Sequence, residues 1–288
     1  MPNHFSQIPF FRRITTLCCC MLLFMAACNG DSEQTLQVLA AASLTEAFIN
    51  IAEEFEAQNP GVKVDLNFGG SQRLRSQIEF GAKVDVFASA DQRQIELLED
   101  QGYVHNLPVI FASNQLVVVS SGNGRVQRIE DLAKPGRRLV IAQKNVPVGA
   151  YSREVLSYLS GETMFGLKPS FKEEVLRNLV SEEPNVKFVV QKVALGEVDA
   201  GIVYQTDVTI AKEAGSFAVI PIPSSANVKA KYPMAVLEEA PEKKLAQSFL
   251  QFVLSTKGQL VLPAHGFTGP GTVKKERCIA TFKFNSPI

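Results

Sequence analysis

The sequence lacks an excess of charge of either sign, because 29 Lys and Arg residues balance 29 Asp and Glu residues. Without a basic surplus nothing indicates nucleic-acid binding, and without an acidic run nothing indicates a solvating tail. With 46% hydrophobic residues in 288, the chain can build one large domain or two lobes with their own cores. Composition therefore indicates a globular protein, and the informative features are local.

Cysteine and histidine are also scarce. Four of the five cysteines lie within residues 18–28, and only Cys278 follows them. One remaining cysteine excludes an internal disulfide and a cysteine metal cluster, so the fold has to rest on its core. His105 and His265 lie far apart and have no metal-ligand neighbours in sequence, so we expect core or surface roles for them.

The N-terminal apolar run, residues 14–27, is too short to span a bilayer and fits the central region of an export signal. It follows Arg12 and Arg13 and ends in two alanines directly before Cys28, as in a bacterial lipobox. We therefore predict a lipoprotein-type signal peptide over 1–27, a lipidated Cys28 and a tether over 28–35. The alternative is an ordinary cleaved signal in which Cys28 is incidental. Both place the protein outside the cytoplasm, and the first anchors it to a membrane in the periplasm or at the cell surface.

From residue 36 strand and helix patterns alternate, which predicts an α/β fold with helices on both faces of mixed, mostly parallel sheets. Strands are predicted at 36–40, 62–68, 84–89, 139–142, 200–204 and 232–237. Helices are predicted at 44–58, 147–160, 185–196 and 242–254, with two more beginning at Ser71 and Asp91. Two α/β blocks and a returning C-terminal segment predict two lobes with a ligand cleft between them.

Two serines stand where a predicted strand gives way to a helix. Ser43 begins a Ser-x-x-Glu pattern with Glu46, which on its own indicates a capping box. Ser71 follows Gly69-Gly70 and leads the next helix. Both lie at the carboxyl edge of one sheet, where open α/β sheets bind ligands, and a helix N-terminus binds anions through free N–H groups. The pattern therefore indicates either two well-capped helices or an anion site.

Two aspartates near this edge have simpler explanations than acid–base or metal chemistry. Asp91 is placed to cap a helix after a strand, and Asp85 stands at a strand start. We expect structural roles for both.

Several motifs, in order along residues 36–268, resemble the periplasmic molybdate-binding proteins of ABC importers. They are Ala41-Ala-Ser43-Leu-Thr, Phe68-Gly-Gly-Ser71, Asp85-Val-Phe-Ala-Ser-Ala-Asp91, Val146-Pro-Val-Gly149, Gly201-Ile-Val-Tyr204 and Tyr232-Pro. The resemblance implies the two-lobed, type II periplasmic-binding-protein fold. We expect lobe 1 over 36–112 and 228–270 and lobe 2 over 113–227. Residues 271–288 continue beyond the point where such chains typically end and receive no function.

The resemblance also implies the ligand contacts. Hydroxyl and backbone N–H groups would come from Ser43 and Ser71, backbone N–H groups from Val148 and Val186, and a hydroxyl from Tyr204. These neutral donors would hold molybdate or tungstate, with no cofactor and no direct protein–metal ligand. For Glu46 we expect a solvent-facing position, because a carboxylate is repelled by a dianion.

The implied function is a monomeric binding protein that delivers its oxyanion to the membrane permease of an ABC importer and catalyses nothing. Another tetrahedral oxyanion such as sulfate is the alternative ligand. A serine hydrolase using Ser43 or Ser71 is an alternative of a different class, but it would need a positioned base, and no Gly-x-Ser-x-Gly motif surrounds either serine.

Overall fold

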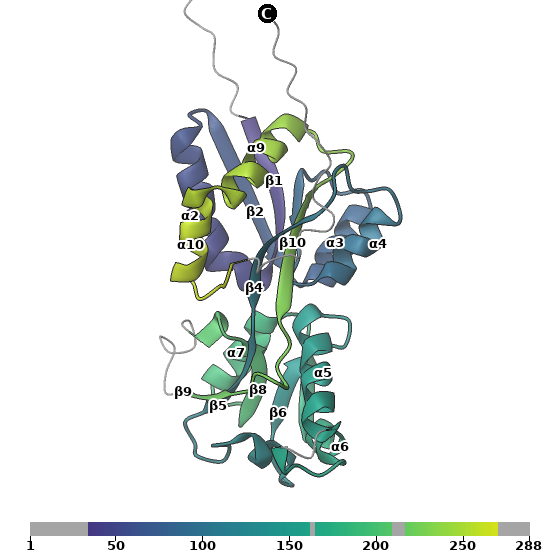
Figure 1. Cartoon of the computed structure of the whole chain (residues 1–288), viewed down its shortest axis with the longest axis vertical. Coiled ribbons are helices and arrows are strands. Elements are labelled where there is room, and N and C mark those ends of the chain that lie inside the picture. Colours follow the sequence, from purple (N-terminus) through teal and green to yellow (C-terminus); the bar gives the residue numbers. More distant parts are fainter. Residues whose placement is uncertain (1–33, 162–164, 209–216, 270–288) are drawn as a thin grey trace, which may run out of the picture.

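The chain forms two lobes, each built on its own five-stranded sheet (Figure 1). The structure is a computed structural model that describes residues 34–161, 165–208 and 217–269. The signal peptide, Cys28, the tether up to residue 33 and the segment 271–288 lie outside these residues. None of the described helices is long and apolar enough to cross a membrane.

The first lobe contains a sheet with the strand order β2-β1-β3-β10-β4. Its strands are β1 (Gln34–Ala41), β2 (Val62–Gly69), β3 (Val86–Ala88), β4 (Val109–Asn114) and β10 (Ala230–Val236). Its helices are η2 (Ala42–Leu44), α2 (Thr45–Gln58), α3 (Ser71–Glu79), α4 (Gln92–Glu99), α9 (Lys243–Leu254) and α10 (Thr256–Ala264).

The second lobe contains a sheet with the order β7-β6-β8-β5-β9. Its strands are β5 (Leu116–Ser121), β6 (Leu139–Ala142), β7 (Leu179–Glu183), β8 (Ala200–Tyr204) and β9 (Phe217–Pro221). Its helices are η3 (Ile129–Ala133), α5 (Pro147–Gly161), α6 (Phe171–Arg177) and α7 (Val186–Ala194).

Each sheet is mixed, and antiparallel pairing is more frequent than the sequence suggests. In the first sheet β1 pairs in parallel with β2 and β3, whereas β10 is antiparallel to β3 and β4. In the second sheet β6 pairs in parallel with β7 and β8, whereas β5 is antiparallel to β8 and β9. The antiparallel strands are the ones next to the crossings between the lobes. They enter their sheets without a βα crossover and therefore do not have to be parallel.

The chain crosses between the lobes twice. It passes from β4 to β5 at Gln115 and returns through residues 222–229 between β9 and β10. The lobes face each other beside these two segments. The parallel strands of both sheets end toward the facing ends of the lobes, so the helices that follow them begin there (Figure 1).

The core of the first lobe has two layers, one on each face of the sheet. Val38 and Ala40 of β1 belong to the layer beneath α2 and α9, and Leu39 belongs to the layer beneath α3 and α4. This alternation follows from the period of two along a strand. Phe55 of α2 and Phe249 of α9 meet edge to face with ring centroids 5.2 Å apart. The packing fixes α2 on the sheet and thereby fixes the position of its N-terminus at the end of the lobe that faces the second lobe.

Candidate functional site

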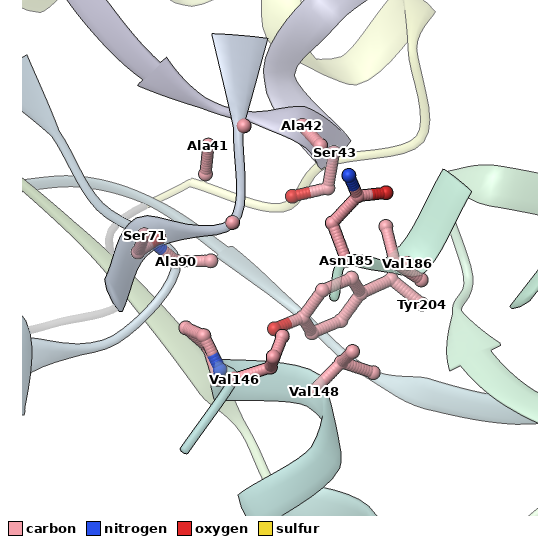
Figure 2. Close-up of a pocket in the computed structure, with 13 residues that line it drawn as sticks. Ala41, Ala42, Ser43, Ser71, Ala90, Val146, Val148, Asn185, Val186 and Tyr204 are labelled. Atoms are coloured by element: carbon pink, nitrogen blue, oxygen red, sulfur yellow. The ribbon is translucent and has the colours of Figure 1, made fainter. Parts of the chain in front are cut away.

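A small cavity lies between the lobes and is lined by residues of both (Figure 2). Its empty volume, which includes space open to solvent, is about 210 Å³, and so small a space suits a compact ligand. All five candidate ligand residues from the sequence line it. The full lining is Ala41, Ala42, Ser43, Gly69, Gly70, Ser71, Ala90, Val146, Pro147, Val148, Asn185, Val186 and Tyr204.

Helix N-termini surround the cavity on both sides. Ser71 and Val186 are the first residues of α3 and α7, and Val148 is the second residue of α5. Ser43 lies in the 3₁₀ turn that leads into α2. The first N–H groups of a helix have no intrahelical acceptor and carry a partial positive charge. The cavity therefore offers backbone donors from four chain segments that are far apart in the sequence.

The capping box predicted for Ser43 and Glu46 does not form. The N-cap of α2 is Leu44, and neither Leu44 nor the preceding turn makes a side-chain capping bond. Glu46 does reach solvent, as expected, because its side chain is 42% exposed, and both of its carboxylate oxygens also accept from Lys187 Nζ at 2.9 Å. Ser43 and Glu46 therefore bond to residues that are distant in sequence and not to each other's backbone. The backbone N–H of Ser43 is therefore free of the Glu46 carboxylate.

The hydroxyl of Ser43 is oriented by a polar chain that the sequence does not reveal. Asn114 Nδ2 donates to Tyr232 Oη at 3.4 Å, and Tyr232 Oη lies 2.9 Å from Ser43 Oγ. Because Tyr232 Oη accepts from the amide, its one hydrogen is available for Ser43, whose own hydrogen then remains to be donated into the cavity. Tyr232 and Asn114 are thus neighbours of the candidate site that sequence reasoning did not select as site residues.

The hydroxyl of Ser71 is prepared in a similar way. Its oxygen accepts the backbone N–H of Ala90 at 3.1 Å, so its hydrogen remains to be donated elsewhere. Ala90 precedes Asp91, which caps α4 by accepting from Gln94 N at 3.1 Å, as the sequence predicts. Asp91 is buried, and its burial raises the pKa of its carboxyl group.

Two backbone donors of the second lobe come from well-defined helix starts. Asn185 caps α7 by accepting from the backbone N–H groups of Lys187 and Phe188 at 2.9 and 3.3 Å, which leaves Val186 N–H unused by the cap. In α5, Pro147 takes the first helical position, as predicted. A Cβ on Gly149 would lie 2.0 Å from the carbonyl oxygen of Gln143, so only glycine permits this tight approach.

Tyr204 supplies the one hydroxyl from the second lobe among the lining residues, at the end of β8. Figure 2 shows it pointing into the space between Ser43, Ser71 and Val146. The side chain is buried, and its hydroxyl has no hydrogen-bond partner within the described part of the chain. Burial, with a smaller contribution from Tyr232, raises its pKa well above the usual value, so the group keeps its proton as a donor. A buried hydroxyl without a partner is costly and indicates a ligand-facing donor.

No charged side chain lines the cavity. Asp85 has a structural role, as predicted, because it accepts from Gln37 N at 2.8 Å and Glu242 N at 2.7 Å. His105 pairs with Glu238, and His265 contacts Asn50. Among the described residues no group of three or more His, Cys, Asp or Glu side chains could hold a metal ion. The site can therefore hold a small anion through neutral donors alone.

Comparisons with known proteins agree with this geometry. Residues 36–268 match the family described as bacterial extracellular solute-binding protein. A molybdate-binding protein of Mycobacterium tuberculosis is 35% identical over 239 residues, which cover 82% of this chain and 85% of that protein. The structure is similar to the periplasmic molybdate-binding protein of Azotobacter vinelandii, with a TM-score of 0.69, 26% identity and coverage of 82% and 99%.

A sulfate-binding protein of Mycobacterium tuberculosis has a similar fold, with a TM-score of 0.73, 18% identity and coverage of 83% of this chain and 88% of that one. At this identity the likeness concerns the fold alone. Together with the family match it identifies the architecture as that of the two-lobed, type II periplasmic binding proteins.

Proposed function

The chain belongs to the bacterial extracellular solute-binding proteins, and on this premise we propose that it captures molybdate or tungstate and delivers it to an ABC importer. Ser43, Ser71, Val148, Val186 and Tyr204 hold the ligand in this proposal. The observation that carries it is the cavity itself, where neutral donors from both lobes surround a volume of about 210 Å³ and the buried Tyr204 hydroxyl has no partner among the described residues.

The donors favour a fully ionised oxyanion. Hydrogen bonds to a charged group stabilise by about 1.5–3 kcal/mol each, so several of them can replace a counter-ion. A ligand that retains a proton, such as phosphate near neutral pH, would also need a buried acceptor. No carboxylate lines the cavity, and that favours molybdate, tungstate or sulfate over phosphate. The names of the similar proteins favour molybdate among these.

Calorimetric titration of the protein with molybdate, tungstate, sulfate and phosphate at one salt concentration tests the proposal. We expect tight binding of molybdate and tungstate, weaker binding of sulfate and none of phosphate. The cavity can separate molybdate from sulfate only by size, because both are tetrahedral dianions. Preferred binding of sulfate would reassign the ligand, and binding of none of the four would contradict an oxyanion site.

The proposal assigns no catalysis to this protein. A serine hydrolase would need a base beside its nucleophile. Ser43 Oγ is paired with Tyr232, and Ser71 Oγ accepts from Ala90 N–H, so neither hydroxyl has a histidine partner in the described chain. We expect no labelling of either serine by a serine-reactive phosphonate.

We also propose that the protein is exported, cleaved before Cys28 and anchored through lipid on that cysteine. The family description supports a location outside the cytoplasm, and the anchor rests on the residues around Cys28. In a cell that processes lipoproteins, Cys28→Ser should move the protein from the membrane fraction to the soluble fraction. A Cys28→Ser variant that stays in the membrane after a salt wash would contradict the anchor.

A further inference from the structure

One lysine joins the two lobes directly beside the cavity. Lys187 Nζ, on α7 of the second lobe, lies 2.9 Å from both carboxylate oxygens of Glu46 on α2 of the first lobe. The same nitrogen lies 3.7 Å from Asp207 Oδ1, within ion-pair distance. Lys187 follows Val186 of the cavity, and Glu46 stands three residues after Ser43. We call these three side chains the Lys187 bridge.

The two carboxylates of the bridge differ in the lobe to which they belong, so opening the lobes would affect their ion pairs with Lys187 differently. Asp207 is buried in the same lobe as Lys187, and its other oxygen accepts the backbone N–H of Tyr204 at 3.1 Å. It keeps its place beside the ammonium group whether the lobes are open or closed. Glu46 belongs to the other lobe, and its side chain is 42% exposed. Opening therefore breaks only the pair between Glu46 and Lys187.

We propose that the Lys187 bridge is a latch between the lobes that slows release of the bound ligand without touching it. Asp207 keeps the Lys187 ammonium group in place within the second lobe, and Glu46 forms its ion pair with this group when the lobes close. Since only the closed arrangement contains the second pair, the pair shifts the equilibrium toward that arrangement. Lys187, Glu46 and Asp207 are thus positioning residues. The part of this inference that concerns release rests on the proposed function.

The solvent exposure of the Lys187–Glu46 pair determines how far the pair can shift the equilibrium between open and closed lobes. The Lys187 side chain is 26% exposed and that of Glu46 42%, so solvent screens the pair. Pairs of this kind change an equilibrium by about two- to fivefold. A latch of that strength lengthens the lifetime of the closed state and still allows release. Gln72 Nε2 also crosses the cleft to the carbonyl oxygen of Pro184 at 3.1 Å, so the bridge is one of several cross-lobe contacts.

The decisive variant is Glu46→Gln, which removes the charge from the exposed end of the latch. Lys187→Met is the second variant, and it leaves the buried Asp207 carboxylate without its cation. Lys187→Arg keeps the charge and serves as the rescue. The control is Lys192→Met, because Lys192 lies on the same helix and pairs with Glu183 at 2.6 Å within one lobe. The probe is radiolabelled molybdate chased with an excess of unlabelled molybdate.

We expect Glu46→Gln to raise the dissociation rate about two- to fivefold with little change in the association rate. Lys187→Arg should behave like wild type, and so should the Lys192→Met control. In the Lys187→Met background, Glu46→Gln should have no further effect, because both changes remove the same pair. Equal dissociation rates in wild type and Glu46→Gln would overturn the latch, as would an equal increase in the control.

A second measurement separates failure of the latch from failure of the proposed ligand. Small-angle scattering without any oxyanion should give a larger radius of gyration for Glu46→Gln than for wild type. If wild type does not bind molybdate, the proposed function fails, and the scattering comparison alone decides the latch. An unchanged radius in that case overturns it.

Discussion

At the scale of single residues, the ligand contact proposed for the Tyr204 hydroxyl can be tested with one substitution. Its ring is held by edge-to-face packing against Tyr232, with centroids 5.8 Å apart, so Tyr204→Phe removes the hydroxyl and leaves the ring in place. The lost hydrogen bond to a dianion, about 1.5–3 kcal/mol, predicts binding weakened roughly ten- to a hundredfold. Calorimetric titration with molybdate measures this. Tyr158→Phe is the control, because that hydroxyl donates to Glu154 on the outer face of the second lobe.

Unchanged molybdate affinity in Tyr204→Phe would show that the Tyr204 hydroxyl does not bind the ligand. A Tyr158→Phe variant that loses as much affinity would show that the loss is not specific to the cavity.

Asp207 predicts a pH dependence of stability. Burial raises its pKa from 3.8 to about 6, so between these values the folded protein binds more protons than the unfolded chain. The free energy of unfolding therefore falls as pH rises through that window, by up to about 3 kcal/mol at 1.36 kcal/mol per pKa unit. Asp207→Asn lacks this contribution. Urea unfolding from pH 4 to 7 should show wild type losing stability relative to the variant, and parallel curves would contradict the raised pKa.

Residue identity at the cavity could be predicted because the serines and Tyr204 stand in recognisable motifs at strand ends. The partners that orient them could not. Tyr232 meets Ser43 across 189 residues of sequence, and Lys187 meets Glu46 across 141. Ser-x-x-Glu is consistent with a capping box locally, but in the fold Ser43 bonds to Tyr232 and Glu46 pairs with Lys187, and local sequence does not encode either partner. Sequence shows which groups are available, and packing decides which of them meet.

At the scale of elements, the start of α3 is pressed against the other lobe. A Cβ on Gly70, the residue before α3, would lie 2.5 Å from the carbonyl oxygen of Pro184, which is backbone and cannot move away easily. Gly70→Ala should therefore hinder closure and weaken molybdate binding at least tenfold, while the stability of the unliganded protein changes little. Titration and thermal unfolding measure the two effects.

Gly161→Ala is the matched control, because nothing lies within 4 Å of the added Cβ. We expect wild-type affinity there. Wild-type affinity in Gly70→Ala as well would mean that the closed arrangement tolerates the extra methyl group and that this contact does not limit closure.

Elements with strong periodicity or clear caps are predicted well from the sequence. The strands β6 and β8 have the predicted bounds, and α7 has the predicted Asn185 cap. The elements β4, β5, η3, α6, β7, β9 and α10 are absent from the prediction. Most are short, and α10 contains Gly258 and Pro263, which oppose a helix in isolation. Packing against α2 and α9 stabilises α10 despite these residues.

At the scale of the whole molecule, the two-block pattern predicts two lobes, but it does not show how the sheets are completed. Strand β10 lies between β3 and β4 although it follows them by more than a hundred residues. Such a return is a long-range pairing that local patterns do not encode. Its consequence reaches the candidate site, because it brings Tyr232 to Ser43 and links the two lobes through a second crossing.

The division of the cavity between the lobes leads to a prediction about shape. Ser43 and Ser71 belong to the first lobe, whereas Val148, Val186 and Tyr204 belong to the second. A ligand that contacts both sets gains contacts only when the lobes are together, so it shifts the population toward the closed arrangement. Saturating molybdate should therefore reduce the radius of gyration in small-angle scattering, with chloride at equal ionic strength as the control.

Ligand binding across both lobes should also raise the stability of the folded protein, and thermal unfolding therefore provides an independent check on the scattering experiment. Ligand at a hundred times its dissociation constant stabilises the folded state by about 2.7 kcal/mol. If the ligand joins the lobes, this stabilisation extends to both of them, and they should unfold in one transition at a raised temperature. A raised transition with an unchanged radius would mean that the protein is already closed before it binds. A raised transition for one lobe alone would place the ligand within that lobe and contradict a site shared across the cleft.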